Sequence, residues 1–311
     1  MAAASTSFHI CRRFHYNSNL LPRRENSFPE RVKASPTRSI ITASMRARRP
    51  QNVPGDFFVD HTCIDCDTCR WMASENFTRV DDMSAVFKQP SCEEERLRAL
   101  QALISCPTNS IHTEKPAHDI LEVQKTFPIP IDEHTMPGVY HCGYHSEKSF
   151  GAASYLIVRD EGNILVDRDD VADHERWSNH LGCERILHSL EVDHSTTAIE
   201  MKLEGSGPWS LGDDIALVHT PGHTKGSVCL LYKPFKVLFT GDHFAMSEFG
   251  WSIFERYNKL SVPKQLNSVK LMLELDFEWI LPGHGRRTKF SDAEEKNSSI
   301  RAFLETKMQL S

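Results

Sequence analysis

Thr220-Pro221-Gly222-His223-Thr224 is the first of three similar stretches in this 311-residue chain. The other two are Thr240-Gly241-Asp242-His243 and Leu281-Pro282-Gly283-His284-Gly285. Each follows a short apolar run and places a His or Asp beside a glycine, where the backbone turns tightly and brings the side chain over the end of a strand. We therefore expect imidazoles and a carboxylate to meet at one edge of a sheet, in a mixture that suits zinc or non-haem iron.

The region around these loops has the pattern of short strands and helices. Residues 154–158 and 164–167 are rich in β-branched and apolar residues and flank the turn Glu161-Gly162-Asn163, which predicts a hairpin. Further strands are expected at 186–188, 215–219, 227–232, 237–240 and 279–281, and helices near 171–181, 263–275 and 291–307. Mixed strands and helices predict a layered α/β sandwich.

The order and spacing of these loops, together with Asp173-His174, resemble the metallo-β-lactamase superfamily over roughly residues 139–290. Members of that superfamily include glyoxalase II, lactonases and flavodiiron proteins. The resemblance implies an αββα sandwich with a binuclear metal site at one edge of its sheets. By position, Asp242 would bridge the two metals, His223 and Asp169 would bind the first, and Asp173, His174 and His284 would bind the second. Asp173 would also orient the attacking nucleophile.

Some of these residues have simpler interpretations. Asp173-His174 at a helix start is also typical of a cap or a solvated turn. Other histidines have no motif context and are expected to be structural or exposed, namely His141, His145, His180, His188, His194 and His219. His243 is a candidate to support a neighbouring ligand.

Two departures from the superfamily pattern stand between Asp167 and His174. The family places a helix and a second strand between the end of the first strand and its metal-binding motif, whereas here Asp167 runs straight into Arg168-Asp169-Asp170. A helix–strand unit of roughly 25 residues is missing on ordinary element lengths, so we expect impaired binding of the first metal. The alternative is a compact natural variant in which Asp167 is a replacement ligand. In addition, Asp169 replaces an imidazole, which moves the preference from zinc toward iron or manganese.

Nine cysteines in a chain without a secretory signal favour metal binding over a disulfide framework. Cys63, Cys66 and Cys69 form a Cys-x2-Cys-x2-Cys triplet, and a helical pattern behind Glu93-Glu94-Glu95 ends at Cys106-Pro107. Residues 55–114 thereby resemble single-cluster bacterial-type ferredoxins, which implies one [4Fe-4S] cluster with Cys106 as the fourth ligand. A structural zinc site is the alternative.

Residues near the triplet and the remaining cysteines carry weaker signals. Trp71 is expected to pack near the cluster. Four isolated cysteines are expected to be small buried hydrophobes, namely Cys92, Cys142, Cys183 and Cys229.

Residues 1–50 carry ten Lys and Arg against only Glu25 and Glu30, and are rich in Ser. This composition predicts a disordered transit peptide, of the plastid stroma or alternatively of the mitochondrion, although a basic disordered tail has the same pattern. The whole chain carries −6, which leaves −14 for residues 51–311 once the +8 of residues 1–50 is removed. Such a surface disfavours nucleic acid as a partner. No apolar run is long enough to span a membrane.

The predicted organisation is a transit peptide (1–50), a ferredoxin-like domain (51–114), a Pro-containing linker (115–138) and a metallo-β-lactamase-like domain (139–311). Three functions remain open. The first is hydrolysis of an ester, thioester, lactone or phosphoester, in which two divalent metals lower the pKa of a water molecule. The second is diiron redox chemistry fed by the [4Fe-4S] cluster and by an electron-transfer partner. The third is a catalytically silent isoform with a binding or regulatory role.

Overall fold

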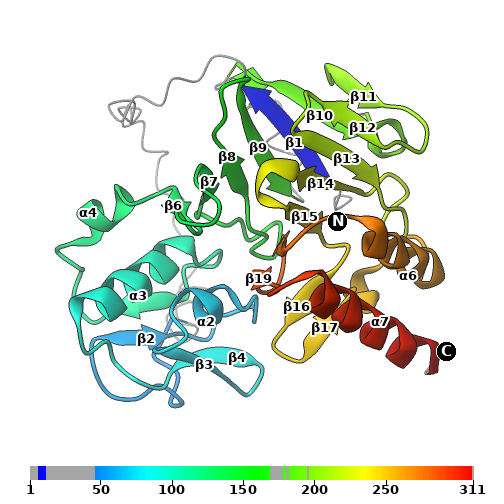
Figure 1. Cartoon of the computed structure of the whole chain (residues 1–311). Helices are drawn as coiled ribbons and strands as arrows, with labels where there is room; N and C mark the ends of the chain where they lie inside the picture. Colours follow the sequence, from blue (N-terminus) through cyan, green and yellow to red (C-terminus); the bar gives the residue numbers. More distant parts are fainter. Residues whose placement is uncertain (1–5, 12–45, 169–177, 180–181, 195, 310–311) are drawn as a thin grey trace.

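The computed structural model describes residues 6–11, 46–168, 178–179, 182–194 and 196–309. Two groups of elements can be followed in Figure 1. Residues 46–125, blue to cyan, form the small domain. Residues 139–309, green to red, form most of the large domain, to which the N-terminal strand also belongs.

Two short hairpin-like sheets and three helices make up the small domain. β2 (Phe57–Val59) pairs with β5 (Ile111–Thr113), and β3 (Phe77–Val80) pairs with β4 (Met83–Val86). The helices are α2 (Thr68–Met72), α3 (Glu93–Ser105) and α4 (Ile120–Gln124). The predicted helix before Cys106 is confirmed as α3: its acidic first turn complements the helix dipole, and Leu100 is fully buried in the core.

The small domain is longer at both ends than the sequence predicts. Arg46 donates to the Asn109 carbonyl (2.7 Å), and Arg49 is buried with its guanidinium on the Val80 carbonyl (2.9 Å). These residues belong to the folded domain rather than to a disordered leader, because their guanidinium groups bind backbone carbonyls of the domain. The linker expected at 115–138 contains α4, whose Val123 is buried in the small-domain core, and a strand that joins the large domain.

The large domain contains two facing sheets. The seven-stranded sheet has the order β11-β10-β1-β9-β8-β7-β6, and the six-stranded sheet has the order β12-β13-β14-β15-β18-β19. The strands of the first sheet are β6 (Ile129–Pro130), β7 (Val139–His141), β8 (Tyr155–Ile157), β9 (Asn163–Arg168), β1 (Thr6–Cys11), β10 (Glu184–His188) and β11 (Met201–Leu203). Those of the second are β12 (Trp209–Leu211), β13 (Ile215–His219), β14 (Val228–Tyr232), β15 (Val237–Gly241), β18 (Trp279–Pro282) and β19 (Thr288–Lys289).

Two apolar layers hold these sheets and helices together. One lies between the sheets and joins Tyr155, Ile164 and Ile186 of the first to Leu230 and Phe239 of the second. The other lies between the six-stranded sheet and two helices, α6 (Val262–Leu271) and α7 (Ala293–Gln309), which lie together on its outer side (Figure 1). The predicted hairpin, five strands and two C-terminal helices are confirmed. The helix expected near 171–181 falls largely outside the described residues.

Strand β1 corrects the expectation that residues 1–50 are wholly disordered. It lies between β9 and β10 and is antiparallel to both, with six residue pairs to β9 and three to β10. In Figure 1 it is the blue arrow within the green sheet. The helix–strand unit that the sequence predicts to be missing would follow β9 along the chain, and β1 pairs with β9 in the sheet. Without β1, two central strands would present unpaired N–H and C=O groups, which explains why an extended segment is stable there.

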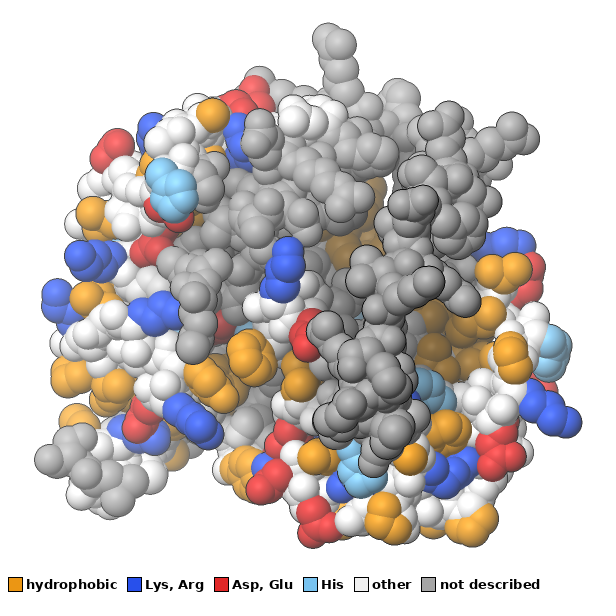
Figure 2. Space-filling model, turned by 180° about the vertical axis from the view of Figure 1, so that it is seen from behind, with side chains coloured by type: hydrophobic (Ala, Val, Ile, Leu, Met, Phe, Trp, Pro, Cys, Tyr) orange, Lys and Arg blue, Asp and Glu red, His pale blue; other side chains and the backbone are white. Residues whose placement is uncertain are grey.

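No helix in the described part of the chain is both long and apolar enough to cross a membrane. On the face seen in Figure 2, the Lys and Arg side chains of the described residues are interspersed with Asp and Glu.

Candidate metal centres

Four cysteines of the small domain gather around the start of α2 and the end of α3. Cys69 lies in α2, Cys63 and Cys66 lie in the loop before it, and Cys106 follows α3. All four are free thiols.

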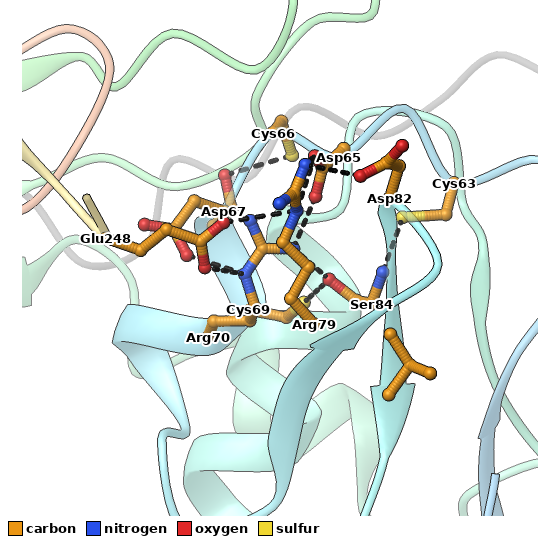
Figure 3. Close-up of polar contacts among 12 residues, drawn as sticks. Cys63, Asp65, Cys66, Asp67, Cys69, Arg70, Arg79, Asp82, Ser84 and Glu248 are labelled. Atoms are coloured by element: carbon orange, nitrogen blue, oxygen red, sulfur yellow. Dashed lines mark hydrogen bonds and ion pairs between the residues drawn. The ribbon is translucent and has the colours of Figure 1, made fainter. Parts of the chain in front are cut away.

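The sulfur of each of these cysteines has an N–H or O–H group nearby. The Cys63 sulfur accepts from the Ser84 N–H (3.4 Å), and the Cys106 sulfur accepts from the Ser110 N–H (3.3 Å). The Ser84 hydroxyl lies 3.2 Å from the Cys69 sulfur, and Figure 3 shows the two side chains facing each other. The fourth group, the Thr68 hydroxyl, lies 3.4 Å from the Cys66 sulfur. Such donors stabilise thiolates that bind iron.

Burial makes two of these thiols, Cys66 and Cys69, depend on a cation for ionisation. Burial raises the pKa of Cys66 to about 11 and that of Cys69 well above its ordinary value, and the neighbouring sulfurs raise both further. Thiolates form here only when positive charge compensates them. Cys63, Cys66, Cys69 and Cys106 therefore fit a [4Fe-4S] cluster, whose irons supply that charge.

A network of ion pairs holds the loop that carries Cys63 and Cys66 (Figure 3). Arg70 pairs with Asp65 (2.8 Å) and Asp67 (2.7 Å), and Arg79 pairs with Asp65 (2.8 Å). Asp65 and Asp67 have φ angles of 58° and 65°, a left-handed conformation that Asp tolerates better than most residues. Glu248 of the large domain reaches the same two arginines, at 3.7 Å from Arg70 and 3.1 Å from Arg79.

The second candidate centre lies at the ends of the strands of the six-stranded sheet. His223 follows β13, Asp242 follows β15 and His284 follows β18, so all three loops lie at one sheet edge as predicted. His284 Nδ1 lies 2.7 Å from Asp242 Oδ1, and Asp242 Oδ2 lies 4.0 Å from His223 Nε2.

Gln265 of α6 fixes two of these loops. Its buried side-chain amide donates to the backbone carbonyls of His243 (2.8 Å) and Asp242 (3.3 Å). Gly222 packs directly on its backbone: a Cβ at Gly222 would lie 2.2 Å from Gln265 Cα, and its φ of +146° strains any other residue. Glycine before His223 is therefore a packing requirement.

His284 is bonded through both ring nitrogens. Its Nε2 donates to the Ser149 carbonyl (2.9 Å), while Nδ1 contacts Asp242. A metal bound through Nε2 would take the place of the Ser149 carbonyl. Within the described residues, no three His, Cys, Asp or Glu side chains converge closely enough to hold one metal ion. The predicted ligands Asp169, Asp173 and His174 lie outside the described residues, as does the helix start that carries Asp173-His174.

His243 is buried beside this centre. Burial lowers its pKa to about 3, with a further contribution from His223, so its imidazole is neutral. Neither ring nitrogen has a hydrogen-bond partner among the described residues.

Two family models match this sequence. Residues 59–113 match the 4Fe-4S single cluster domain of Ferredoxin I, and residues 172–284 match the metallo-beta-lactamase superfamily. One segment of the chain is thus similar to single-cluster ferredoxin domains, and a second segment is similar to metallo-beta-lactamases. The first match contains all four predicted cluster cysteines, and the second contains His223, Asp242 and His284 together with Asp173 and His174.

Solved metallo-beta-lactamase structures cover about half of the chain. The structure of VMB-1 at pH 5.5 is 13% identical to this chain, with a TM-score of 0.38. The alignment covers 49% of this chain and 85% of VMB-1. The metallo-beta-lactamase from Pontibacter korlensis is 13% identical, with a TM-score of 0.38, and covers 52% and 93%. TTHA1623 in a di-iron-bound form is 16% identical, with a TM-score of 0.37, and covers 48% and 93%. No curated protein sequence is similar enough to count as a relative.

The large domain contacts the small domain through residues that carried no motif in the sequence. Trp71, expected near the cluster, packs against His141 (5.3 Å between ring centroids), and the Arg287 guanidinium lies 4.2 Å from the centroid of the Trp71 ring. His145 contacts Thr68 (3.1 Å). Burial lowers the pKa of His145 to about 3, so this imidazole is neutral. Isolated histidines in a loop gave no sequence signal of this contact.

Proposed function

We propose that the chain is a ferredoxin-fused, metal-dependent hydrolase of the metallo-beta-lactamase superfamily. Its substrate class would be an ester, thioester, lactone or phosphoester. The observation that supports this most directly is the meeting of His223, Asp242 and His284 at one sheet edge. Divalent metals held there would polarise the scissile bond and lower the pKa of the attacking water.

The residues of this chain would bind, orient and move protons around that reaction. Asp242 is placed to hold His284 through Nδ1, which fixes the ring orientation, and a metal bound at Nε2 would displace the hydrogen bond to the Ser149 carbonyl. His223 and Asp242 would share the metal site, with Asp169, Asp173 and His174 as further proposed ligands. Asp173 would orient the water whose oxygen attacks the carbonyl carbon or phosphorus, while the proton passes to the leaving group as its bond breaks.

The test is hydrolysis of a panel of thioesters, lactones and phosphodiesters by the anaerobically purified chain, supplied in turn with zinc, iron and manganese. Asp242→Asn should lower kcat at least a hundredfold, whereas Asp276→Asn, at an exposed position after α6, should leave it unchanged. Equal activity of the two variants would reject Asp242 as part of the catalytic centre.

A second candidate is redox chemistry at the large-domain centre. It is favoured by the closeness of the ferredoxin segment, since a Cβ at Gly151 would lie 3.2 Å from the Cys66 sulfur and Ser149 bonds His284. An electron-transfer partner would then reduce the cluster. Zinc in the large domain together with thioesterase activity would exclude this candidate, and two irons bleached by dithionite would exclude simple hydrolysis.

We also propose that the chain acts in the plastid stroma on a small molecule, without nucleic acid or membrane partners. The Arg- and Ser-rich composition of residues 12–45 and the −14 charge of residues 51–311 support this. Cleavage of such a leader after import would also remove β1 from the sheet. Fusing residues 1–50 to a fluorescent protein tests the location: plastid import supports it, and mitochondrial or diffuse fluorescence contradicts it.

A further inference from the structure

Segment 141–151 lies between the two candidate metal centres. It connects β7 to β8 in the large domain, and both of its buried histidines face the small domain. The Trp71 ring of α2 packs on His141 at 5.3 Å and on His145 at 6.5 Å between centroids. This segment of the large domain therefore contacts α2, the helix that carries Cys69.

A continuous hydrogen-bonded chain leads from Cys66 into the large domain. Thr68 Oγ1 lies 3.4 Å from the Cys66 sulfur and 3.1 Å from His145 Nδ1, and His145 Nε2 lies 2.8 Å from His141 Nε2. The Thr68 hydroxyl has one proton. When it donates to the thiolate of Cys66 it must accept from His145 Nδ1–H, and His145 Nε2 must then accept from His141. Every donor in the chain thus points toward Cys66.

Gly151 brings the backbone of the large domain close to the cluster ligand Cys66. A Cβ at this position would lie 3.1 Å from Cys66 Cβ, 3.2 Å from the Cys66 sulfur and 3.2 Å from Pro107 Cγ. No side chain fits between these atoms without displacing them. The backbone of the large domain therefore covers Cys66 and excludes water from that side of the sulfur.

The same turn is hydrogen-bonded to a residue of the second candidate centre. The Ser149 carbonyl, two residues before Gly151, accepts from His284 Nε2 (2.9 Å). The turn is also bonded internally, because the Gly151 N–H (2.9 Å) and the Ser149 hydroxyl (3.1 Å) both donate to the Ser146 carbonyl. While His284 Nε2 donates to Ser149 and binds no metal, a displacement at Gly151 is consequently transmitted to Ser149 and His284.

We propose that His145 and Gly151 are positioning residues for the cluster ligand Cys66, and that the turn 146–151 ties the environment of the cluster to His284. Hydrogen bonds to the ligand sulfurs and exclusion of water set the reduction potential of an iron–sulfur cluster. The large domain thus affects the reduction potential of the cluster. The inference rests on the ferredoxin part of the proposed function and requires no reaction at the large-domain centre.

Gly151→Ala tests the close approach, with Gly205→Ala as its matched control. The two glycines have nearly equal φ angles, +80° and +81°, but a Cβ at Gly205 meets nothing within 4 Å. In the anaerobically purified whole chain, we expect Gly205→Ala to keep the wild-type midpoint potential and electron paramagnetic resonance spectrum of the reduced cluster. Gly151→Ala should change both, or should lose the cluster. Identical behaviour of the two variants would overturn the proposal.

Thr68→Val tests the hydrogen-bonded chain, because valine is close to threonine in size but has no hydroxyl. Removing the hydroxyl that donates to Cys66 should lower the midpoint potential, because the donor stabilises the more negative reduced cluster, and Thr68→Ser should restore it. His145→Leu should shift the potential in the same direction. The double variant should shift it no further than Thr68→Val, since both act through one chain. Additive shifts of the midpoint potential, or no shift in any variant, would reject the hydrogen-bonded chain.

His284→Ala tests the tie between the two centres, with His188→Ala as the control. His188 is a buried histidine of the same domain, bonded to the Gly205 carbonyl (3.0 Å) and remote from the turn in its contacts. We expect His284→Ala to lose its cluster to an iron chelator severalfold faster than wild type, and His188→Ala to match wild type. Equal rates in the two variants would contradict the tie. A chain that contains no four-iron cluster at all would instead refute the ferredoxin assignment.

Discussion

At several positions of this chain, the residue type is determined by the atoms packed against it rather than by the chemistry of its own side chain. Gly222 is the clearest case, because its backbone lies against Gln265 and that glutamine holds the loops of Asp242 and His243. The candidate ligands are therefore placed by a neighbour that binds no metal itself.

Gly222→Ala should unfold the loop that carries His223. Its Cβ would overlap Gln265 backbone atoms, and overpacking of this kind costs about 1–3 kcal/mol. Gly250→Ala is the control, since Gly250 has a φ of +106° but a Cβ there meets nothing within 4 Å. Chemical denaturation followed by circular dichroism measures both. Equal losses of unfolding free energy would show that backbone strain, not the contact with Gln265, explains the glycine.

Glu200 should make the stability of the large domain depend on pH. Its hydrogen bonds to buried Arg185 of β10 lower its pKa from 4.5 to about 2. A lowered pKa means that the folded state favours the ionised form, so the stabilisation is complete above pH 4.5 and disappears as the pH falls toward 2. Because Glu200 is 40% exposed, solvent screening limits the effect at neutral pH to about 1 kcal/mol.

The comparison of Glu200→Gln with wild type, by denaturation at pH 7 and at pH 3, measures this dependence. The difference in unfolding free energy should shrink at pH 3. Glu204→Gln, on the exposed loop after β11, should show no difference at either pH. A loss from Glu200→Gln that is the same at both pH values would exclude an ionic origin.

The residues of both centres were predictable where spacing carried the signal. The four cysteines could be named from the Cys-x2-Cys-x2-Cys triplet and the later Cys106-Pro107, whereas His223, Asp242 and His284 could be named because loops with a glycine recur in the sequence. His145 and Gly151 could not, because their importance comes from packing between segments far apart in the chain, which no local pattern encodes.

Among the elements, the strands with continuous apolar runs and the helices with clear periodicity were predictable. β14 and β15 are buried along their whole length, and α3 shows apolar residues at helical spacing. β1 was not predictable, because it comes from a basic, Ser-rich region and its pairing depends on an opening between β9 and β10. α4 was not predicted, because it lies in a segment whose prolines favour a linker.

Removing β1 should destabilise the large domain and leave the small domain intact. Deletion of residues 2–11 exposes two central strand edges, whereas deletion of residues 2–5 leaves β1 in place. We expect the first deletion to lower the Tm of the large domain by about 5 °C or more without reducing the iron content per chain. Identical melting curves for the two deletions would show that the sheet does not need this strand.

At the scale of the whole molecule, the two domains are joined by charges as well as by segment 141–151. Glu248, between β16 (Ala245–Ser247) and β17 (Gly250–Ser252), pairs with Arg79 and Arg70, and Arg286 pairs with Asp67 (3.3 Å). Partly exposed pairs of this kind contribute up to about 1 kcal/mol each and weaken with salt.

Glu248→Gln should loosen the contact between the domains without unfolding either. Amide hydrogen exchange in residues 245–252 and 65–72 should increase, and high salt should produce the same increase in wild type. Glu305→Gln, on α7, serves as the control and should leave exchange in both segments unchanged. No change in Glu248→Gln would show that packing around Trp71, rather than charge, holds the domains together.

Iron and acid-labile sulfide per chain, measured after anaerobic purification, test most directly whether the two centres are distinct. About four irons and four sulfides are expected in wild type and in His284→Ala, together with any further metal in wild type alone. Cys106→Ser should lose the cluster. Cys92→Ser should keep it, because Cys92 is exposed and not buried as the sequence predicts. Zinc in place of the four irons, or iron and sulfide that disappear with His284 rather than with Cys106, would contradict a cluster in the small domain beside a separate centre in the large one.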